Sequence, residues 1–150
     1  MKKITFGLII LAISIIFLGC SSSTKEVSGV NKLKGIEYEI VENVPRNIEN
    51  SIEDIKENQG YKVIESKENG KYIYIGLGEK NTGGYDIVIE KVEKDDNITK
   101  ITIMEYKPKT DDMVTQAITY PYKIIKIEDI EDVKDIKVVT IKGKEFKIIE

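Results

Sequence analysis

The sequence contains no histidine, and its 150 residues include a single cysteine, Cys20. Histidine is the side chain best suited to proton transfer near neutral pH, so its absence excludes Ser-His and Cys-His nucleophile pairs. Metal sites built on histidine or on several thiolates are excluded as well. Because one thiol cannot form a disulfide within the chain, the folded part has to be stabilised by a hydrophobic core.

The sequence also lacks the clusters of basic residues that nucleic-acid binding requires. Arg46 is the only arginine, the formal net charge is −3, and the lysines do not form a basic cluster. A surface of this kind does not attract phosphate backbones or anionic lipid headgroups. The composition therefore argues against nucleic acid and against an anionic lipid surface as the main partner.

The amino terminus has the pattern of an export signal. Lys2 and Lys3 precede an apolar run over residues 4–18. At a rise of ~1.5 Å per residue this run gives about 23 Å of helix, which is shorter than a bilayer span needs. The segment is therefore expected to target the chain for secretion.

The residues around the cysteine resemble the lipobox of bacterial lipoproteins. Phe17, Leu18 and Gly19 lead directly to Cys20. The resemblance implies that residues 1–19 are a signal peptide, that the Cys20 thiol receives a diacylglycerol and that the chain is held on the extracytoplasmic face of the membrane. The alternative is an uncleaved amino-terminal anchor with an incidental free cysteine.

After the signal the chain divides into a polar segment and a patterned one. Residues 20–35 lack sustained periodicity and are rich in Ser, Lys and Gly, so we interpret them as a flexible tether. Residues 36–150 are long enough for one domain with its own core. Alternation over residues 36–40 indicates a half-buried strand at its start.

One helix is expected near the beginning of this domain. Pro45 suits the first turn of a helix, and apolar residues follow at spacings of four and three, at Ile48, Ile52 and Ile55. Gly60 should end it.

Strands rich in isoleucine are expected after the helix, with a tight turn at Asn69-Gly70. Their expected ranges are 61–65, 71–77, 85–92, 98–106, 114–120, 122–127 and a final hairpin of 136–141 with 146–149. The fold class is therefore α+β: one N-terminal helix packed on a twisted, mainly antiparallel sheet that could curl into a barrel.

The sequence offers no catalytic residue, metal site or cofactor site. The acidic clusters Asp95-Asp96-Asn97 and Asp111-Asp112 lack the alternating spacing of a calcium loop, so we interpret both as turns. The glycine-rich segment 76–84 lacks the lysine that follows the final glycine of a P-loop, and it has Asn81 where a dinucleotide fingerprint has its third glycine. It also precedes a predicted strand instead of a helix. Pairs of carboxylates for glycoside chemistry are not selected by any spacing.

Three sequence elements in a fixed order resemble the C-terminal domain of the PrcB family of protease complex subunits. They are G-E-K-N-T-G-G-Y at residues 78–85 with an alternating strand after it, Y-K-P at 106–108, and V-T-Q-A-I-T-Y-P-Y at 114–122. The similarity covers about residues 71–130. It implies a non-catalytic, lipid-anchored subunit that associates with a subtilisin-like surface protease and assists its assembly or stability.

The same elements supply the candidate contact residues for a protein partner. Gly83 and Gly84 would allow a sharp start of the following strand, and Pro121 should lie at an edge or bulge. The full set of candidates is Glu79, Lys80, Asn81, Thr82, Gly83, Gly84, Tyr85, Tyr120, Pro121 and Tyr122. Each could equally be a conformational necessity of the fold.

Two other functions fit the sequence. A direct protease inhibitor is one, because glycine-rich loops that end in T-G-Y-like sequences also occur in chagasin-type inhibitors of cysteine proteases. An envelope structural lipoprotein is the other. An inhibitor would abolish the activity of its protease, an accessory subunit would bind with activity retained, and a structural protein would bind neither protease.

Overall fold

The computed structural model describes residues 34–66, 70–127 and 135–150. The predicted signal peptide, the predicted lipidation site Cys20, residues 20–33 of the predicted tether and Asn69 of the predicted turn lie outside these residues. None of the described helices has both the length and the apolar character that crossing a membrane requires.

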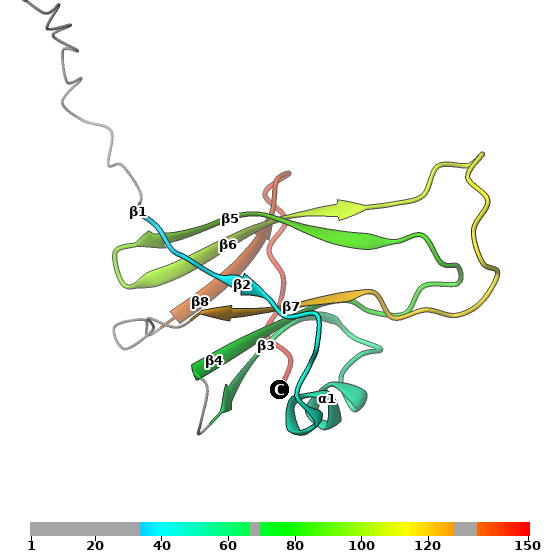
Figure 1. Ribbon diagram of the computed structural model, residues 1–150. Coiled ribbons are helices and arrows are strands. Elements are labelled where there is room, and N and C mark those ends of the chain that lie inside the picture. Colours follow the sequence, from blue (N-terminus) through cyan, green and yellow to red (C-terminus); the bar gives the residue numbers. More distant parts are fainter. Residues whose placement is uncertain (1–33, 67–69, 128–134) are drawn as a thin grey trace, which may run out of the picture. The chain divides into compact units, whose positions relative to one another are not determined.

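The described residues form two four-stranded sheets and one helix (Figure 1). The first sheet has the order β1-β5-β6-β8 and the second the order β2-β7-β4-β3. The elements are β1 Lys34–Gly35, β2 Glu39–Ile40, α1 Arg46–Glu53, β3 Gln59–Ser66, β4 Gly70–Leu77, β5 Asp86–Asp95, β6 Ile98–Tyr106, β7 Tyr122–Ile127 and β8 Asp135–Thr140.

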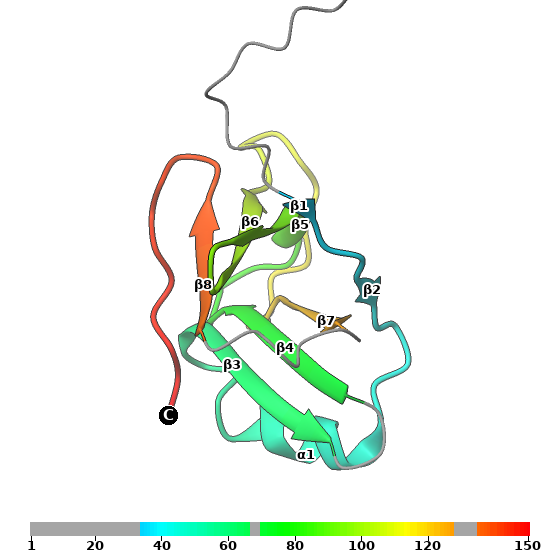
Figure 2. The ribbon, with the colours of Figure 1, turned by 90° about the vertical axis from the view of Figure 1, so that its left-hand side faces the viewer.

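The main core lies between the two sheets, which face each other as layers (Figure 2). Alternate residues of each strand point into it, as the period of two along a strand requires. The first sheet contributes Ile87, Ile101, Ile103 and Val138, and the second contributes Ile73, Ile75, Ile125 and Ile127, with Phe146 from the carboxyl-terminal segment. Burial of each such side chain stabilises the fold by roughly 1.5–3 kcal/mol.

A second core lies on the other face of the second sheet, where α1 packs. Ile48 and Ile52 of the helix meet Tyr72 and Tyr74 of β4 and Ile124 of β7. Strand β4 is therefore buried on both faces, which explains why its sequence is apolar almost without interruption. The expected apolar stripe of residues 48, 52 and 55 is the buried side of this helical segment.

The structure is mostly β with one short helix, and two details of the predicted fold are wrong. The helix is not the N-terminal element, because β1 and β2 precede it. The sheets do not close into a barrel, since β1 and β2 pair over only two residues each and leave the two sheets as separate layers. The pairing of β6 with β8 is parallel, so the first sheet is mixed.

Three predicted strands are also wrong. Residues 36–40 do not form one strand, because the chain leaves the first sheet after Gly35 and joins the second at Glu39. Residues 114–120 and 146–149 form only isolated bridges. At the predicted boundary of the tether, Lys34 and Gly35 already pair with β5, so regular structure begins before residue 36.

Candidate functional site

Two connections between the sheets lie at the same end of the sandwich (Figure 1). Residues 78–85 lead from β4 in the second sheet to β5 in the first, and residues 107–121 return from β6 to β7. We call this pair of segments the two-loop end. It contains nine of the ten predicted contact residues, and the tenth, Tyr122, is the first residue of β7.

Backbone hydrogen bonds hold the two segments together. The N–H groups of Lys80 and Thr119 each donate to the other residue's C=O at 2.9 Å, and the Gly83 N–H donates to the Thr115 C=O at 2.9 Å. The Thr119 hydroxyl donates to the Thr82 C=O at 2.8 Å. The predicted strand at 114–120 is absent because these separate contacts replace a continuous ladder.

Two neighbouring glycines have different roles in this contact. Gly84 has a φ of +84°, and a Cβ there would lie 2.8 Å from Val114 Cγ1. Gly83 has ordinary backbone angles, and its nearest neighbour would be Thr115 Cβ at 3.5 Å. Only Gly84 is therefore required by both conformation and space.

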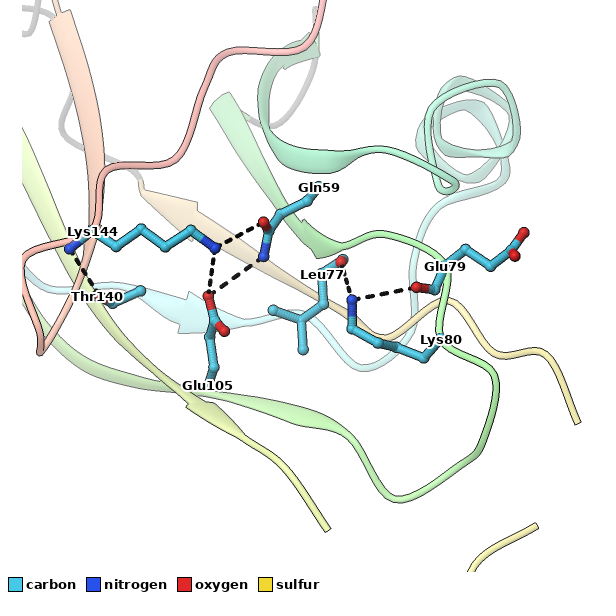
Figure 3. Close-up of polar contacts among 7 residues, drawn as sticks. All are labelled: Gln59, Leu77, Glu79, Lys80, Glu105, Thr140 and Lys144. Atoms are coloured by element: carbon cyan, nitrogen blue, oxygen red, sulfur yellow. Dashed lines mark hydrogen bonds and ion pairs between the residues drawn. The ribbon is translucent and has the colours of Figure 1, made fainter. Parts of the chain in front are cut away.

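Lys80 is turned toward its own loop. Its Nζ donates to the Leu77 C=O at 2.6 Å and to the Glu79 C=O at 3.3 Å (Figure 3). The same Nζ lies 5.7 Å from the centre of the Tyr85 ring. Glu79 and Asn81 are exposed, so the predicted contact stretch 79–81 divides into two exposed side chains and one that supports the loop.

The bend at Tyr120-Pro121-Tyr122 is fixed to its surroundings at each residue. The Pro121 C=O accepts the Leu77 N–H at 2.9 Å, and the Tyr122 ring lies 5.5 Å from the Tyr74 ring. Lys56, three residues after the end of α1, places its Nζ 5.3 Å from the centre of the Tyr120 ring. Partial burial, followed by the carboxylates of Glu79 and Glu57, raises the pKa of Tyr120.

The most exposed apolar side chains of the two-loop end were not singled out from the sequence. Met113 is fully exposed and Ile118 is 58% exposed. Ile118 lies in the predicted strand 114–120, which does not form, and no sequence pattern marks Met113. Earlier in the same segment, Asp112 Oδ2 accepts the Lys109 N–H at 2.8 Å, so Asp112 is a turn residue as expected.

Beyond the loops, a polar cluster joins both sheets to the carboxyl-terminal segment (Figure 3). Lys144 Nζ donates to Gln59 Oε1 at 2.9 Å and lies 3.6 Å from Glu105 Oε1, to which Gln59 Nε2 donates at 3.4 Å. These exposed contacts fasten the turn after β8 to β3 and β6. In the described residues, His, Cys, Asp and Glu side chains do not gather in threes around a common metal position.

Comparison with known proteins gave one result. Residues 71–128 match the family model described as PrcB C-terminal. The search of curated proteins and the search of solved structures each found no match. The matched range runs from β4 to the end of β7 and includes both segments of the two-loop end. The part of the chain that holds the candidate site is therefore related to the PrcB C-terminal family, as its sequence elements indicated.

Proposed function

We propose that this chain is a non-catalytic accessory subunit that binds a subtilisin-like protease at the cell surface. The observation that carries the proposal is the position of the family match. It spans the two-loop end and the strands that support it, and leaves out α1 and β8. A family of protease complex subunits whose shared region includes this end is expected to use it for contact with a protein.

The contact surface that we propose is centred on Met113 and Ile118. Both side chains are exposed, and the segment that bears them is held by the bonds from Gly83 and Lys80 to Thr115 and Thr119. Exposed apolar side chains on a pre-ordered support favour binding, because less conformational entropy is lost when the partner covers them. Glu79 and Asn81 would lie at the polar rim of this surface.

Several predicted contact residues have supporting roles in this proposal. Lys80, Thr82, Gly84 and Pro121 hold the two segments in place through their backbones or through an inward side chain. Substituting them would change the shape of the surface as well as its chemistry. Met113 and Ile118 are the better probes, because their side chains face solvent.

A capture experiment with a matched control tests the contact. The full chain is expressed with an affinity tag in its source cells, membranes are solubilised, and bound proteins are identified by mass spectrometry. A subtilisin-like protease should be recovered with the parent chain and lost with Met113→Asp plus Ile118→Asp. The control is Ile148→Asp, which changes a residue 63% exposed outside the matched range and should retain the protease.

The activity of the captured protease separates the alternatives. An accessory subunit predicts that the protease in the complex hydrolyses a peptide substrate at its normal rate or faster, and that it is degraded sooner without the subunit. Lost activity would replace the proposal with an inhibitor, and recovery of neither subtilisin-like nor papain-like proteases would favour a structural lipoprotein. Absence of any protease from the parent sample would contradict the proposal.

The membrane anchor is a separate part of the proposal, supported by the lipobox-like sequence before Cys20. Cells labelled with an alkyne analogue of palmitate should incorporate it into the parent chain and not into Cys20→Ser. Protease added outside intact cells should degrade the chain, as expected for the extracytoplasmic face. Equal labelling of both chains would contradict lipidation at this residue.

A further inference from the structure

The turn after α1 meets the first loop of the two-loop end, and this contact brings two carboxylates together. The Glu79 N–H donates to the Glu57 C=O at 3.2 Å. Gly78 allows the close approach, because its φ is +73° and a Cβ there would lie 2.8 Å from the Gln59 N and 2.9 Å from the Glu57 O. Both glutamate side chains are exposed. The fold therefore holds two like charges at adjacent backbone positions.

The ion pairs of the described residues include neither of these two carboxylates. Lys56, the residue before Glu57, places its Nζ 2.5 Å from Glu53 Oε2. Lys80 directs its Nζ to two backbone carbonyls of its own loop, and the Glu79 carboxylate points away from it (Figure 3). Like charges held together repel each other, so a cation from outside the chain would relieve the repulsion.

A tyrosine ring lies beside the two carboxylates. Lys80 and Thr119 form an antiparallel bridge, so their neighbours Glu79 and Tyr120 face each other. The Nζ of Lys56 lies 5.3 Å from the centre of the Tyr120 ring. The face of an aromatic ring attracts cations. An ammonium group of the chain itself already lies against this ring, which shows that the position suits a cation.

A second ring, that of Tyr122, covers an unused hydroxyl. Tyr122 is 38% exposed and packs against Tyr74, with 5.5 Å between the ring centres. The Tyr74 hydroxyl is buried, has no hydrogen-bond partner among the described residues, and lies against Gly76, which pairs with Tyr122. Buried polar groups are almost always hydrogen-bonded. The unpaired hydroxyl beneath the ring and the unpaired carboxylates beside it both indicate a polar ligand at this place.

The electrostatic potential here is negative in spite of Lys56. Partial burial raises the pKa of Tyr120 most, Glu79 and Glu57 raise it further, and Lys56 lowers it by less than either carboxylate raises it. We call the side chains of Glu57, Glu79, Tyr120 and Tyr122 the tyrosine-carboxylate surface. Its charge favours a cationic ligand.

We infer that the tyrosine-carboxylate surface binds an arginine side chain of the partner protein. A guanidinium group is planar, so it can stack on a tyrosine ring while its N–H groups donate to both carboxylates. The ammonium group of lysine is more strongly hydrated and has no flat face to stack. The inference rests on the proposed function in one respect, that the arginine belongs to the protein bound at the two-loop end, where Glu79 lies at the rim.

The test uses three capped tripeptides, with arginine, lysine or citrulline between two glycines, added to the full chain in detergent. Citrulline has the shape of arginine without its charge. The arginine peptide should shift the NMR signals of the Tyr120 and Tyr122 rings and of the Glu79 amide in a saturable way. The lysine peptide should bind several-fold more weakly, and the citrulline peptide should leave these signals in place.

Two variants with opposite expected effects test the assignment of the site. Glu57→Gln plus Glu79→Gln should weaken binding of the arginine peptide at least about tenfold, because two charge-assisted hydrogen bonds are lost. Lys56→Met should strengthen it, because the internal cation leaves the Tyr120 ring. The matched control is Glu42→Gln plus Glu49→Gln, which makes the same change in net charge at exposed positions and should bind as the parent does.

The possible outcomes distinguish this inference from the proposed function. Equal shifts with citrulline, unchanged affinity in the Glu57→Gln plus Glu79→Gln variant, or weaker binding by Lys56→Met would overturn the inference. In the capture experiment, this double variant should lose the subtilisin-like protease that the parent recovers. Its full recovery would overturn the inference while the proposed function stands. Arginine binding at this surface, without any protease captured by the parent, would have the opposite meaning.

Discussion

Lys80 and Thr119 exchange both of their backbone hydrogen bonds, each at 2.9 Å, although they are separated by two complete strands. This one pair makes the two segments of the two-loop end a single unit. The surface that carries Met113 and Ile118 is therefore supported by the loop that carries the glycines. The family match covers both segments.

The hydroxyl of Thr119 should contribute measurably to the stability of this pair. Thr119→Val removes the hydrogen bond to the Thr82 C=O while keeping the shape of the side chain. We expect a loss of about 1 kcal/mol in the free energy of unfolding, measured by denaturant titration. Thr115→Val is the control, because Thr115 takes part through its backbone C=O and should lose less than half as much. Equal losses would show that the hydroxyl bond is unimportant.

The neighbouring glycines make a matched pair of substitutions. Gly84→Ala places a Cβ 2.8 Å from Val114 Cγ1 at a φ of +84°, so we expect a loss of about 1–3 kcal/mol in unfolding free energy. Gly83→Ala meets its nearest atom at 3.5 Å with ordinary backbone angles, and its stability should change by less than about 0.5 kcal/mol. Thermal and denaturant unfolding of both variants would measure the difference. A larger loss for Gly83→Ala would contradict the geometry.

The buried hydroxyl of Tyr74 should cost stability. Among the residues that the structure describes it has no hydrogen-bond partner, whereas the Tyr61 hydroxyl donates to the Ile136 C=O at 2.6 Å. An unpaired buried polar group costs about 1–3 kcal/mol, so Tyr74→Phe should leave the unfolding free energy unchanged or raise it. Tyr61→Phe should lower it by about 1 kcal/mol. Destabilisation by Tyr74→Phe would indicate a partner for its hydroxyl.

The same tyrosine predicts a dependence on alkaline pH. Burial, with a smaller contribution from Tyr122, raises the pKa of Tyr74 from 10.0 to about 12. Below pH 10 neither state ionises this group, and its contribution is fully present. As the pH rises toward 12 the unfolded chain ionises first, so stability is lost. The difference in stability between Tyr74→Phe and the parent should therefore widen above pH 10 in denaturant titrations, and a constant difference would contradict the raised pKa.

Local sequence patterns predicted the parts of the fold that depend on neighbours along the chain. Residues 61–65 and 71–77 lie in β3 and β4, which pair from Gln59↔Leu77 to Ser66↔Gly70 and confirm the predicted hairpin. Gly70, predicted as a turn residue, is the first residue of β4. The apolar run of β4 carried further information, because a strand that is apolar at successive positions is buried on both faces. This pattern predicts three layers, the helix and the two sheets, in place of a barrel.

Such local patterns could not predict contacts between segments that are distant in the sequence. Residues 114–120 have the alternation of a strand, but they meet the loop at 78–85 at separate points, and nothing in their own sequence distinguishes this from a ladder. The parallel pairing of β6 with β8 depends on which strands become neighbours. The two-loop end could be anticipated from its residue types, whereas the exposure of Met113 required the fold.

The short pairing of β1 affects how the fold responds to tension at its amino-terminal side. Among the described residues, only Lys34 and Gly35 pair with β5 there, so a pull on the amino-terminal side of the sandwich loads this two-residue pairing first. Detachment of residues 34–38 would release about 17 Å of extended chain before the pairing of β2 with β7 bears load. If the domain is anchored through its amino terminus, tension would lengthen the extended chain between the anchor and the sandwich. The two-loop end would not be disturbed.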